Sequence, residues 1–192
     1  MIVVLSTSSP LASAAAFSAD HRLLASESME APMAASGACL AMLDLLFDRT
    51  NKAISDVELF VADIGPGSFT GVKVAVTLAK ALAYSLERQT GGISSFDLIS
   101  ADKVVALPSR KGEWFVRRPG LPVERASLLP NEEIVGFGPG ISDSHYPDAA
   151  NAGPLLSLVT AVSPEELVPN YVVEPSISTP KKPFIGAGAA PA

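Results

Sequence analysis

The stretch Gly65-Pro66-Gly67-Ser68-Phe69-Thr70-Gly71-Val72-Lys73 separates an apolar segment from a long helical pattern. Three of its first seven residues are glycine, which reaches positive φ at little cost, so the sequence specifies backbone geometry here. A turn between a strand and a helix points amide N–H groups at whatever lies in front of it, in many proteins a phosphate. The loop therefore poses a choice between a nucleotide-using enzyme and a binding subunit.

The segments around this loop predict an α/β fold. Val57–Ile64, before the loop, is apolar enough for a central strand, and a helix is expected after it from about Thr70 to Glu87. Upstream, three strands with a hairpin turn at Asp20-His21 and then a helix are expected: Ile2–Ser8, Ser13–Ala19, Arg22–Ser28, and Met33 to about Asp48. The order β-β-β-α-β-α is the pattern of the ribonuclease H-like or actin-like ATPase core, which places an antiparallel meander beside a parallel crossover.

The signals weaken beyond this core. Ser94 or Ser95 can cap a third helix, with Asp97 in its first turn. Two strands and a helix are expected further on: Glu113–Arg117, Glu133–Phe137 and Pro154–Val162. We predict an N-terminal actin-like lobe over residues 1–97, a smaller C-terminal lobe over 98–174, and a flexible tail, rich in proline, glycine and alanine, over 175–192.

Composition restricts the classes of function. The 192 residues include 14 basic and 20 acidic side chains, a net charge of −6, so extensive direct contact with nucleic acid is not expected. Cys39 is the only cysteine, which excludes an internal disulfide and a thiolate metal cage. The N-terminal residues lack the basic region of a signal peptide, and no apolar run approaches the ~20 residues of a membrane helix. We expect a cytoplasmic protein with no membrane contact.

The two long helices are apolar over more of their circumference than one sheet covers. On the second helix one apolar stripe would be enough to pack against the sheet, yet further apolar residues lie outside that stripe. The first helix has few polar positions between residues 34 and 47. We therefore expect an interface with a partner or a second copy. Its predicted residues are Cys39, Leu40, Met42, Leu43, Leu46, Val74, Leu78 and Ala81. The alternative is that both helices are sandwiched inside the domain.

The loop fits neither of two catalytic patterns. A Walker A motif has four residues between its glycines and then Lys-Ser/Thr, whereas five residues separate Gly65 from Gly71. The Gly-x-Ser-x-Gly frame of a hydrolase elbow is absent around Ser68. Two interpretations stay open: Ser68 or Thr70 caps the helix while the glycines allow tight packing, or the loop keeps some anion binding.

No other group of side chains predicts catalysis or metal binding. A serine nucleophile needs a nearby base, and the only histidines are His21, in a predicted hairpin turn, and His145, in a polar loop. They do not stand at metal-ligand spacing. We predict no catalytic residue, no metal ligand and no cofactor.

The heptapeptide Gly65–Gly71, followed by Lys73 and a helix containing Ala79-Lys80-Ala81-Leu82-Ala83, resembles the signature of the TsaB (YeaZ) family. Three further segments resemble that family at corresponding places: Gly92–Ser95, Arg110–Glu113 and Leu167–Tyr171. The resemblance covers most of the chain and is strongest between Val57 and Ser95.

This resemblance implies an actin-like ATPase fold of two lobes and a close relationship to TsaD, the catalytic subunit that makes the threonylcarbamoyl modification on adenosine 37 of tRNAs reading ANN codons. It implies a non-catalytic scaffold that pairs with a TsaD-like subunit and a TsaE-like ATPase, often forms a homodimer when alone, and meets tRNA only indirectly. In the family the first two helices make the pairing surface, and here these are the two over-apolar helices.

Three residues depart from the expected pattern. Ser6 stands where the first strand of an actin-like ATPase normally ends in aspartate. Pro108 and Pro139 stand where chains of the family usually carry an acidic residue. Without these carboxylates no set of hard oxygen ligands for Mg²⁺ is evident, and the His-x-x-x-His motif of the catalytic relative is absent. Two alternatives are an actin-like-fold ATPase or kinase that uses Gly65–Gly71 for phosphate, and a glycoprotease-like peptidase, which lacks a nucleophile–base pair here.

Overall fold

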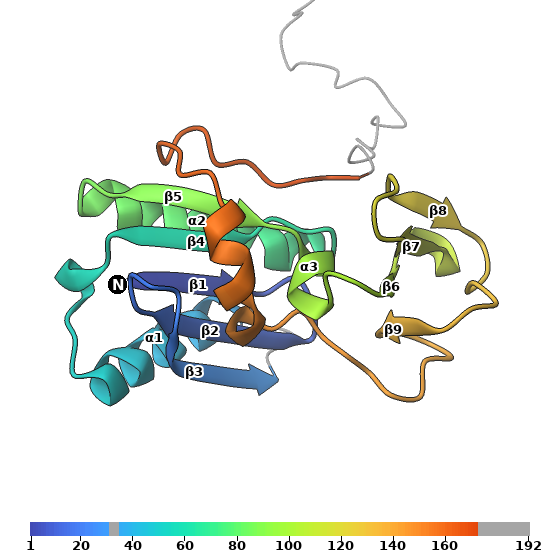
Figure 1. Ribbon diagram of the computed structural model, residues 1–192, viewed down its shortest axis with the longest axis horizontal. Helices are drawn as coiled ribbons and strands as arrows, with labels where there is room; N and C mark the ends of the chain where they lie inside the picture. The colour runs from blue at the N-terminus through green and yellow to red at the C-terminus, as the bar shows by residue number, and fades with distance from the viewer. Residues whose placement is uncertain (31–34, 173–192) are drawn as a thin grey trace, which may run out of the picture.

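The computed structural model describes residues 1–30 and 35–172. Two sheets lie along the long axis of the molecule (Figure 1), with strand orders β3-β2-β1-β4-β5 and β8-β7-β6-β9. This mixed α/β architecture of two lobes matches the predicted actin-like, ribonuclease H-like fold. The predicted start of the first helix at Met33 and the predicted tail at 175–192 lie outside the described residues.

The first half of the chain has the predicted order of elements. With a short turn η1 (Ile54–Asp56) added, these are β1 (Ile2–Ser6), β2 (Leu11–Phe17), β3 (Leu23–Glu30), α1 (Ala35–Thr50), β4 (Leu59–Asp63) and α2 (Phe69–Ser85). β2 is antiparallel to both β1 and β3, and β1 is parallel to β4. The antiparallel meander beside a parallel crossover is therefore confirmed.

The first hairpin turn is wider than predicted. The backbone N–H of Ser18 donates to the Arg22 carbonyl over 2.9 Å, and His21 has φ of +63°. The Ser18 hydroxyl also bonds to Asp20. These polar contacts of Ser18 belong to the turn, and β2 ends at Phe17. The strand begins two residues earlier than expected, at Leu11.

The alternation of side chains along the strands divides the core of the first lobe into two layers. Val3 and Leu5 point to the face covered by α1 and α2, whereas Ile2 and Val4 point to the opposite face. That opposite face is covered by η3 (Ala149–Leu158), which lies in front of the sheet in Figure 1 with both long helices behind it. Each face of the sheet is thus packed against helical structure, as central strands of this type require.

β5 (Gln89–Ile93) was not predicted, and it extends the sheet parallel to β4. Its centre is Gly91-Gly92, and glycine is depleted in strands because it offers no side chain to pack. Here the absence of a side chain has a use, because a Cβ at Gly91 would lie 2.3 Å from a methyl group of Val159. The residue lets the C-terminal part of the chain pack against this edge, where Thr90 and Val162 form a bridge.

The second lobe is built on a small four-stranded sheet. The elements after β5 are α3 (Ser95–Ile99), β6 (Val104–Pro108), η2 (Arg110–Gly112), β7 (Trp114–Arg117), β8 (Glu124–Ala126) and β9 (Ile134–Gly136). The predicted strands correspond to β7 and β9, whereas β6 and β8 were not predicted. One face of this sheet packs with Phe96 and Phe137, and the other contains Trp114.

The predicted helix Pro154–Val162 is instead the ten-residue 3₁₀ segment η3, which begins earlier at Ala149 and contains Pro154. Proline has no N–H and disfavours the α conformation in the residue before it, so a regular α-helix does not form across this position. Through η3 the chain returns from the second sheet to the first. The division of the chain at residue 97 stays a prediction.

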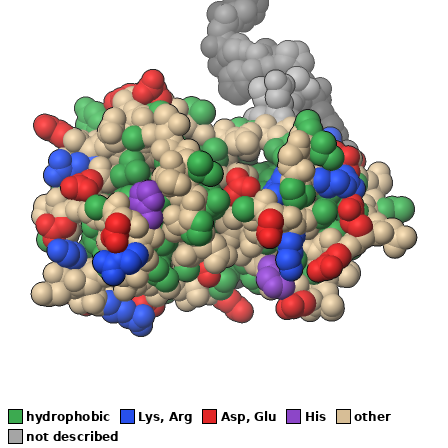
Figure 2. Space-filling view, viewed as in Figure 1, with side chains coloured by type: hydrophobic (Ala, Val, Ile, Leu, Met, Phe, Trp, Pro, Cys, Tyr) green, Lys and Arg blue, Asp and Glu red, His purple; other side chains and the backbone are tan. Residues whose placement is uncertain are grey.

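Charged side chains of both signs are interspersed over the face seen in Figure 2. Within residues 1–30 and 35–172, no helix combines the length and apolar character needed to cross a bilayer.

Candidate functional site

The glycine loop ends at a capped helix. Ser68 is the N-cap of α2, because its hydroxyl accepts a hydrogen bond from the Gly71 N–H over 3.2 Å and its carbonyl accepts one from the Val72 N–H. Thr70, the other candidate for this role, lies inside the helix. The hydroxyl of Ser68 is therefore used within its own helix.

The glycines of the loop allow close contact with the end of β1. A Cβ built on Gly71 would lie 1.8 Å from the Thr7 carbonyl oxygen, and one on Gly67 would lie 2.4 Å from that of Ser8. Gly65 has φ of +95°, a conformation that other residues rarely adopt. Each glycine thus has a local steric reason that involves no ligand.

Several amide N–H groups of the loop already have acceptors within the protein. Gly65 donates to the Asp63 carboxylate over 2.8 Å, and Ser68 donates to the Ser8 carbonyl over 2.7 Å. With the Gly71 N–H bonded to Ser68, three donors that a phosphate would need are occupied. This geometry favours the packing interpretation of the loop over an anion cradle.

A buried carboxylate lies directly behind the loop. Asp63 ends β4 and is fully buried. Three serine hydroxyls donate to it: Ser6 over 2.7 Å, Ser8 over 2.5 Å and Ser95 over 2.5 Å. We call Asp63 and these three residues the serine cage. It joins the ends of β1 and β4 to the start of α3.

Burial raises the pKa of the Asp63 carboxyl, and its hydrogen bonds with Ser8, Ser95, Ser6 and the Gly65 N–H oppose that rise. Serine hydroxyls can donate to an ionised carboxylate or accept from a protonated one, so the cage satisfies both forms. Its four partners occupy both carboxylate oxygens. This arrangement suits a structural joint better than a group that receives a proton from a substrate.

Sequence reasoning missed Asp63, although a signal existed. It identified the absence of a carboxylate at Ser6, which the structure places at the end of β1 with its hydroxyl on Asp63. The carboxylate at this edge of the sheet therefore comes from β4 instead. A single acidic residue in an apolar strand next to a glycine turn was the available signal. Among the described residues, no three His, Cys, Asp or Glu side chains gather as metal ligands would.

The structure corrects half of the predicted interface. Four of its residues form part of the protein's own core beneath α1, with at most 3% exposure: Cys39, Met42, Leu43 and Leu46. They cover the inward face of the helix and have no surface to offer a partner. The other four remain accessible: Leu40 is 53% exposed, Ala81 is exposed, and Val74 and Leu78 are half-buried.

Two segments that carry the family resemblance pack together although they are 100 residues apart. The backbone N–H of Asn170 donates to the Ile64 carbonyl over 2.7 Å, just before the glycine loop. The rings of Phe69 and Tyr171 are 5.1 Å apart, and the Lys73 ammonium lies 3.9 Å above the Phe69 ring. The C-terminal segment is therefore fixed against the start of α2.

A groove of about 720 Å³ runs between α2 and this C-terminal segment. Lys80 crosses one part of it, because its ammonium donates to the carbonyls of Glu165 and Leu167. Tyr84 and Val168 line it and are largely exposed, at 72% and 63%. Apolar surface on α2 thus extends beyond the residues predicted from sequence.

Comparison with known proteins relates the chain to one group. Residues 31–108 match the family described as TsaD, tRNA N6-adenosine threonylcarbamoyltransferase. A stretch of 57 residues is 40% identical to the Bacillus subtilis (strain 168) protein named tRNA threonylcarbamoyladenosine biosynthesis protein TsaB, and it covers 30% of this chain and 25% of that relative. The chain thus matches about a quarter of the length of this relative.

Two solved structures share the fold. One is a Pseudomonas aeruginosa protein described as uncharacterized with similarity to peptidase YEAZ, with a TM-score of 0.77, 20% identity, and coverage of 90% of this chain and 99% of that one. The other is YeaZ from Pseudomonas aeruginosa, with a TM-score of 0.74, 21% identity, and coverage of 89% and 99%. At 20% and 21% identity the two structures show a shared fold, and the sequence matches relate parts of this chain to the TsaD family and to a TsaB protein.

Proposed function

We propose that this chain is a non-catalytic, TsaB-like subunit in the formation of threonylcarbamoyladenosine on tRNA, and that it works in the cytoplasm beside a TsaD-like catalytic subunit. The observation that carries the proposal is the 57-residue stretch that is 40% identical to the Bacillus subtilis TsaB protein. The match of residues 31–108 to the TsaD family supports it, because this segment contains both long helices.

The geometry of the glycine loop supports the non-catalytic part of the proposal. Its amides at Gly65, Ser68 and Gly71 already have acceptors in the protein. Asp63 is enclosed by hydroxyls, and the Ser6 hydroxyl lies 3.5 Å from the carbonyl of Pro147, so another part of the chain covers the cage. Mg-ATP titrated into the protein by calorimetry should give no heat of tight binding; tight binding with hydrolysis would favour the ATPase or kinase alternative.

The accessible parts of α1 and α2 support pairing with another subunit. Leu40 on α1 is mostly exposed, and Val74, Leu78 and Ala81 follow one another at helical spacing on α2. Apolar side chains grouped at neighbouring helices are typical of an interface. We propose that this surface binds the TsaD-like subunit, that the isolated chain forms a homodimer through it, and that a TsaE-like ATPase joins the assembly. The tRNA is then bound by the partners.

Deletion of the gene tests the pathway. The tRNA nucleosides of the deletion strain, separated and weighed by mass spectrometry, should lack threonylcarbamoyladenosine, and expression of this chain should restore it. Affinity purification of the tagged chain should recover the host's TsaD-like and TsaE-like proteins. An unchanged level of the modified nucleoside in the deletion strain would refute the proposal.

Two leucines of α1 provide a matched test of the interface. Leu40→Glu places a charge on an exposed position, so the protein should fold but lose its partner. Leu43→Glu places a charge in the core, where Leu43 is 3% exposed, so this variant should unfold and cannot report on pairing. Light scattering of the isolated chain and co-purification with the TsaD-like protein measure the outcome. A folded Leu40→Glu variant with parent-like pairing would exclude this surface.

A further inference from the structure

Within residues 1–30 and 35–172, the chain runs from the first sheet to the second over residues 94–103, after β5, and returns over residues 137–148, after β9. The helix α3 (Ser95–Ile99) forms half of the first passage and lies between the two sheets in Figure 1. With five residues it is too short to be stable by itself, because isolated helices need ~12–15 residues. Its position must therefore be fixed by contacts with its surroundings.

The first sheet holds the start of α3 through the serine cage. The Ser95 hydroxyl donates to Asp63 over 2.5 Å and lies 3.1 Å from the Ser8 hydroxyl. The Ser95 N–H donates to the Gly65 carbonyl over 3.0 Å. All of these groups are buried, so losing Ser95 would leave a buried carboxylate one hydrogen bond short.

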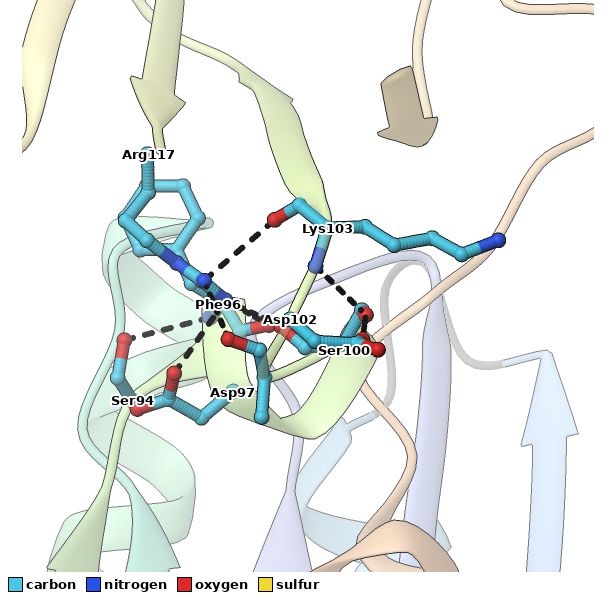
Figure 3. A network of polar contacts seen from close by, with 8 residues as sticks. Ser94, Phe96, Asp97, Ser100, Asp102, Lys103 and Arg117 are labelled. Carbon is cyan, nitrogen blue, oxygen red and sulfur yellow. Dashed lines mark hydrogen bonds and ion pairs between the residues drawn. The ribbon is translucent and has the colours of Figure 1, made fainter. Parts of the chain in front are cut away.

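The second sheet holds the end of α3 through Arg117 of β7. Figure 3 shows this side chain among the carbonyl groups around the end of the helix. Its Nη1 donates to the Ala101 carbonyl over 2.9 Å, and its Nη2 donates to the carbonyls of Phe96, over 3.3 Å, and Ser100. The guanidinium is nearly buried and lies 3.3 Å from the Asp97 carboxylate.

This arrangement uses both properties of arginine. Carbonyl groups at the end of a helix lack partners within the helix, and a cation there is also favoured by the helix dipole. The planar fork of Arg117 reaches several carbonyls at once, which the single ammonium of lysine does not. Removing the fork would take one donor from each of these carbonyls, although the Phe96 carbonyl also accepts from the Ser100 N–H.

The returning passage of the chain also meets α3. The Leu98 carbonyl accepts hydrogen bonds from the Asp148 N–H over 3.3 Å and from the Asn151 side-chain amide over 2.8 Å. Leu98 itself is buried in the core of the first lobe. Both of these passages therefore contact this one helix.

We propose that α3 is a locked hinge, in which two polar clamps, Asp63–Ser95 on the first sheet and Arg117 with the α3 carbonyls on the second, fix the orientation of one lobe relative to the other. Each clamp satisfies a buried polar side chain, the Asp63 carboxyl in one and the Arg117 guanidinium in the other, so rotation of the lobes would leave that group short of hydrogen-bond partners. Opening either clamp frees the hinge. While both hold, a partner bound to one lobe also positions the other.

Spin labels on the two lobes test the proposal. Tyr84→Cys on α2 and Leu128→Cys beside the second sheet place labels at sites that are 72% and 80% exposed. Cys39 is buried, and burial raises the pKa of its thiol to about 11, so it does not compete for the label. Diluted into an excess of unlabelled protein, so that few homodimers carry two labelled copies, the labelled parent should give one narrow distribution of label distances in pulsed electron paramagnetic resonance.

Two variants open the clamps and one serves as control. Ser95→Ala and Arg117→Lys should each add a second population at a different label distance. The double variant should resemble the single variants, because the orientation of the lobes requires both clamps and opening one already frees the hinge. Ser94→Ala removes a neighbouring hydroxyl that accepts only from the Phe96 N–H of α3 itself, and it should keep the parent distribution.

Parent-like distributions in folded Ser95→Ala and Arg117→Lys would overturn the proposal, and so would an equal change in Ser94→Ala. If Arg117→Lys does not fold, Ser95→Ala decides alone, because it removes one hydroxyl from a position where alanine fits. Circular dichroism of each labelled variant establishes that it is folded.

Discussion

Replacing Gly71 with alanine tests whether close packing, rather than a ligand, explains the glycine loop. The new Cβ would lie 1.8 Å from the carbonyl oxygen of Thr7, where ordinary contact begins at 3.4 Å. The obstacle is backbone, so no side-chain rotation relieves it. The end of β1 and the start of α2 must move apart, and the hydrogen bond from the Thr7 hydroxyl to the Gly71 carbonyl, 2.6 Å long, is weakened or lost.

The expected loss of stability follows from three contributions. Overpacking a tight site costs about 3 kcal/mol, the upper part of the usual range, because the contact is with backbone. The weakened hydrogen bond adds about 1 kcal/mol. Alanine gains about 1 kcal/mol over glycine inside a helix. The free energy of unfolding should therefore fall by about 3 kcal/mol in Gly71→Ala.

Gly37→Ala is the matched control. Gly37 is exposed on α1, and a Cβ there meets nothing within 4 Å. This variant should gain about 0.5–1 kcal/mol, because only helix propensity changes. Urea unfolding followed by circular dichroism measures both variants. A Gly71→Ala protein as stable as the parent, or one stabilised like Gly37→Ala, would refute the packing argument.

Three further predictions concern the core and the buried titrating groups. Leu46→Ala should lower the free energy of unfolding by about 2–5 kcal/mol, because Leu46 is buried. Leu40→Ala on the same helix should change it by less than about 0.5 kcal/mol, because Leu40 is exposed. Urea titration measures both variants, and equal losses of stability would contradict this difference in burial. Because the pKa of Asp63 is raised in the folded protein, the folded protein binds this proton more tightly than the unfolded chain does. The contribution of Asp63 to the free energy of unfolding should therefore fall as the pH rises from the ordinary pKa of 3.8 to the raised pKa of the folded state. The free energy of unfolding of the parent and of Asp63→Asn, measured at several pH values, checks this. The parent should lose stability relative to the variant as the pH rises, and parallel curves of stability against pH would contradict the prediction. Burial raises the pKa of the Cys39 thiol to about 11, so a thiol reagent should react with the folded protein at least about 100-fold more slowly than with the unfolded chain; comparable rates would contradict this.

The strands and helices with clear periodicity could be predicted from sequence. α2 begins and ends within two residues of the predicted Thr70 and Glu87, because a capping serine and an apolar stripe mark it. β5 could not be predicted, because its glycines are explained only by tertiary packing, of Val159 against Gly91 and of Ile64 against Gly92. The second sheet was predicted in part, since β8 is short and largely exposed. Such strands carry little hydrophobic signal of their own.

The predicted interface shows where composition alone misleads. Many apolar residues of α1 that were predicted to face a partner are part of the protein's own core, where Cys39, Met42 and Leu46 pack against the sheet. Periodicity gives the faces of a helix, but it does not give how far neighbouring helices and strands enclose each face. Leu40 remained outside this enclosure, and no property of its sequence neighbourhood distinguished it from Leu43.

The glycine loop, which suggested a phosphate site, can be explained without one. Gly67 and Gly71 are required by the carbonyls of Ser8 and Thr7, just after β1, and Gly65 by its positive φ. Three amides that could bind an anion, those of Gly65, Ser68 and Gly71, are bonded to Asp63, Ser8 and Ser68. Preservation of the loop therefore does not argue for nucleotide chemistry, because packing alone would preserve it. The structural part of an argument for function then rests on the accessible surface of α1 and α2, where Leu40 and Ala81 are exposed.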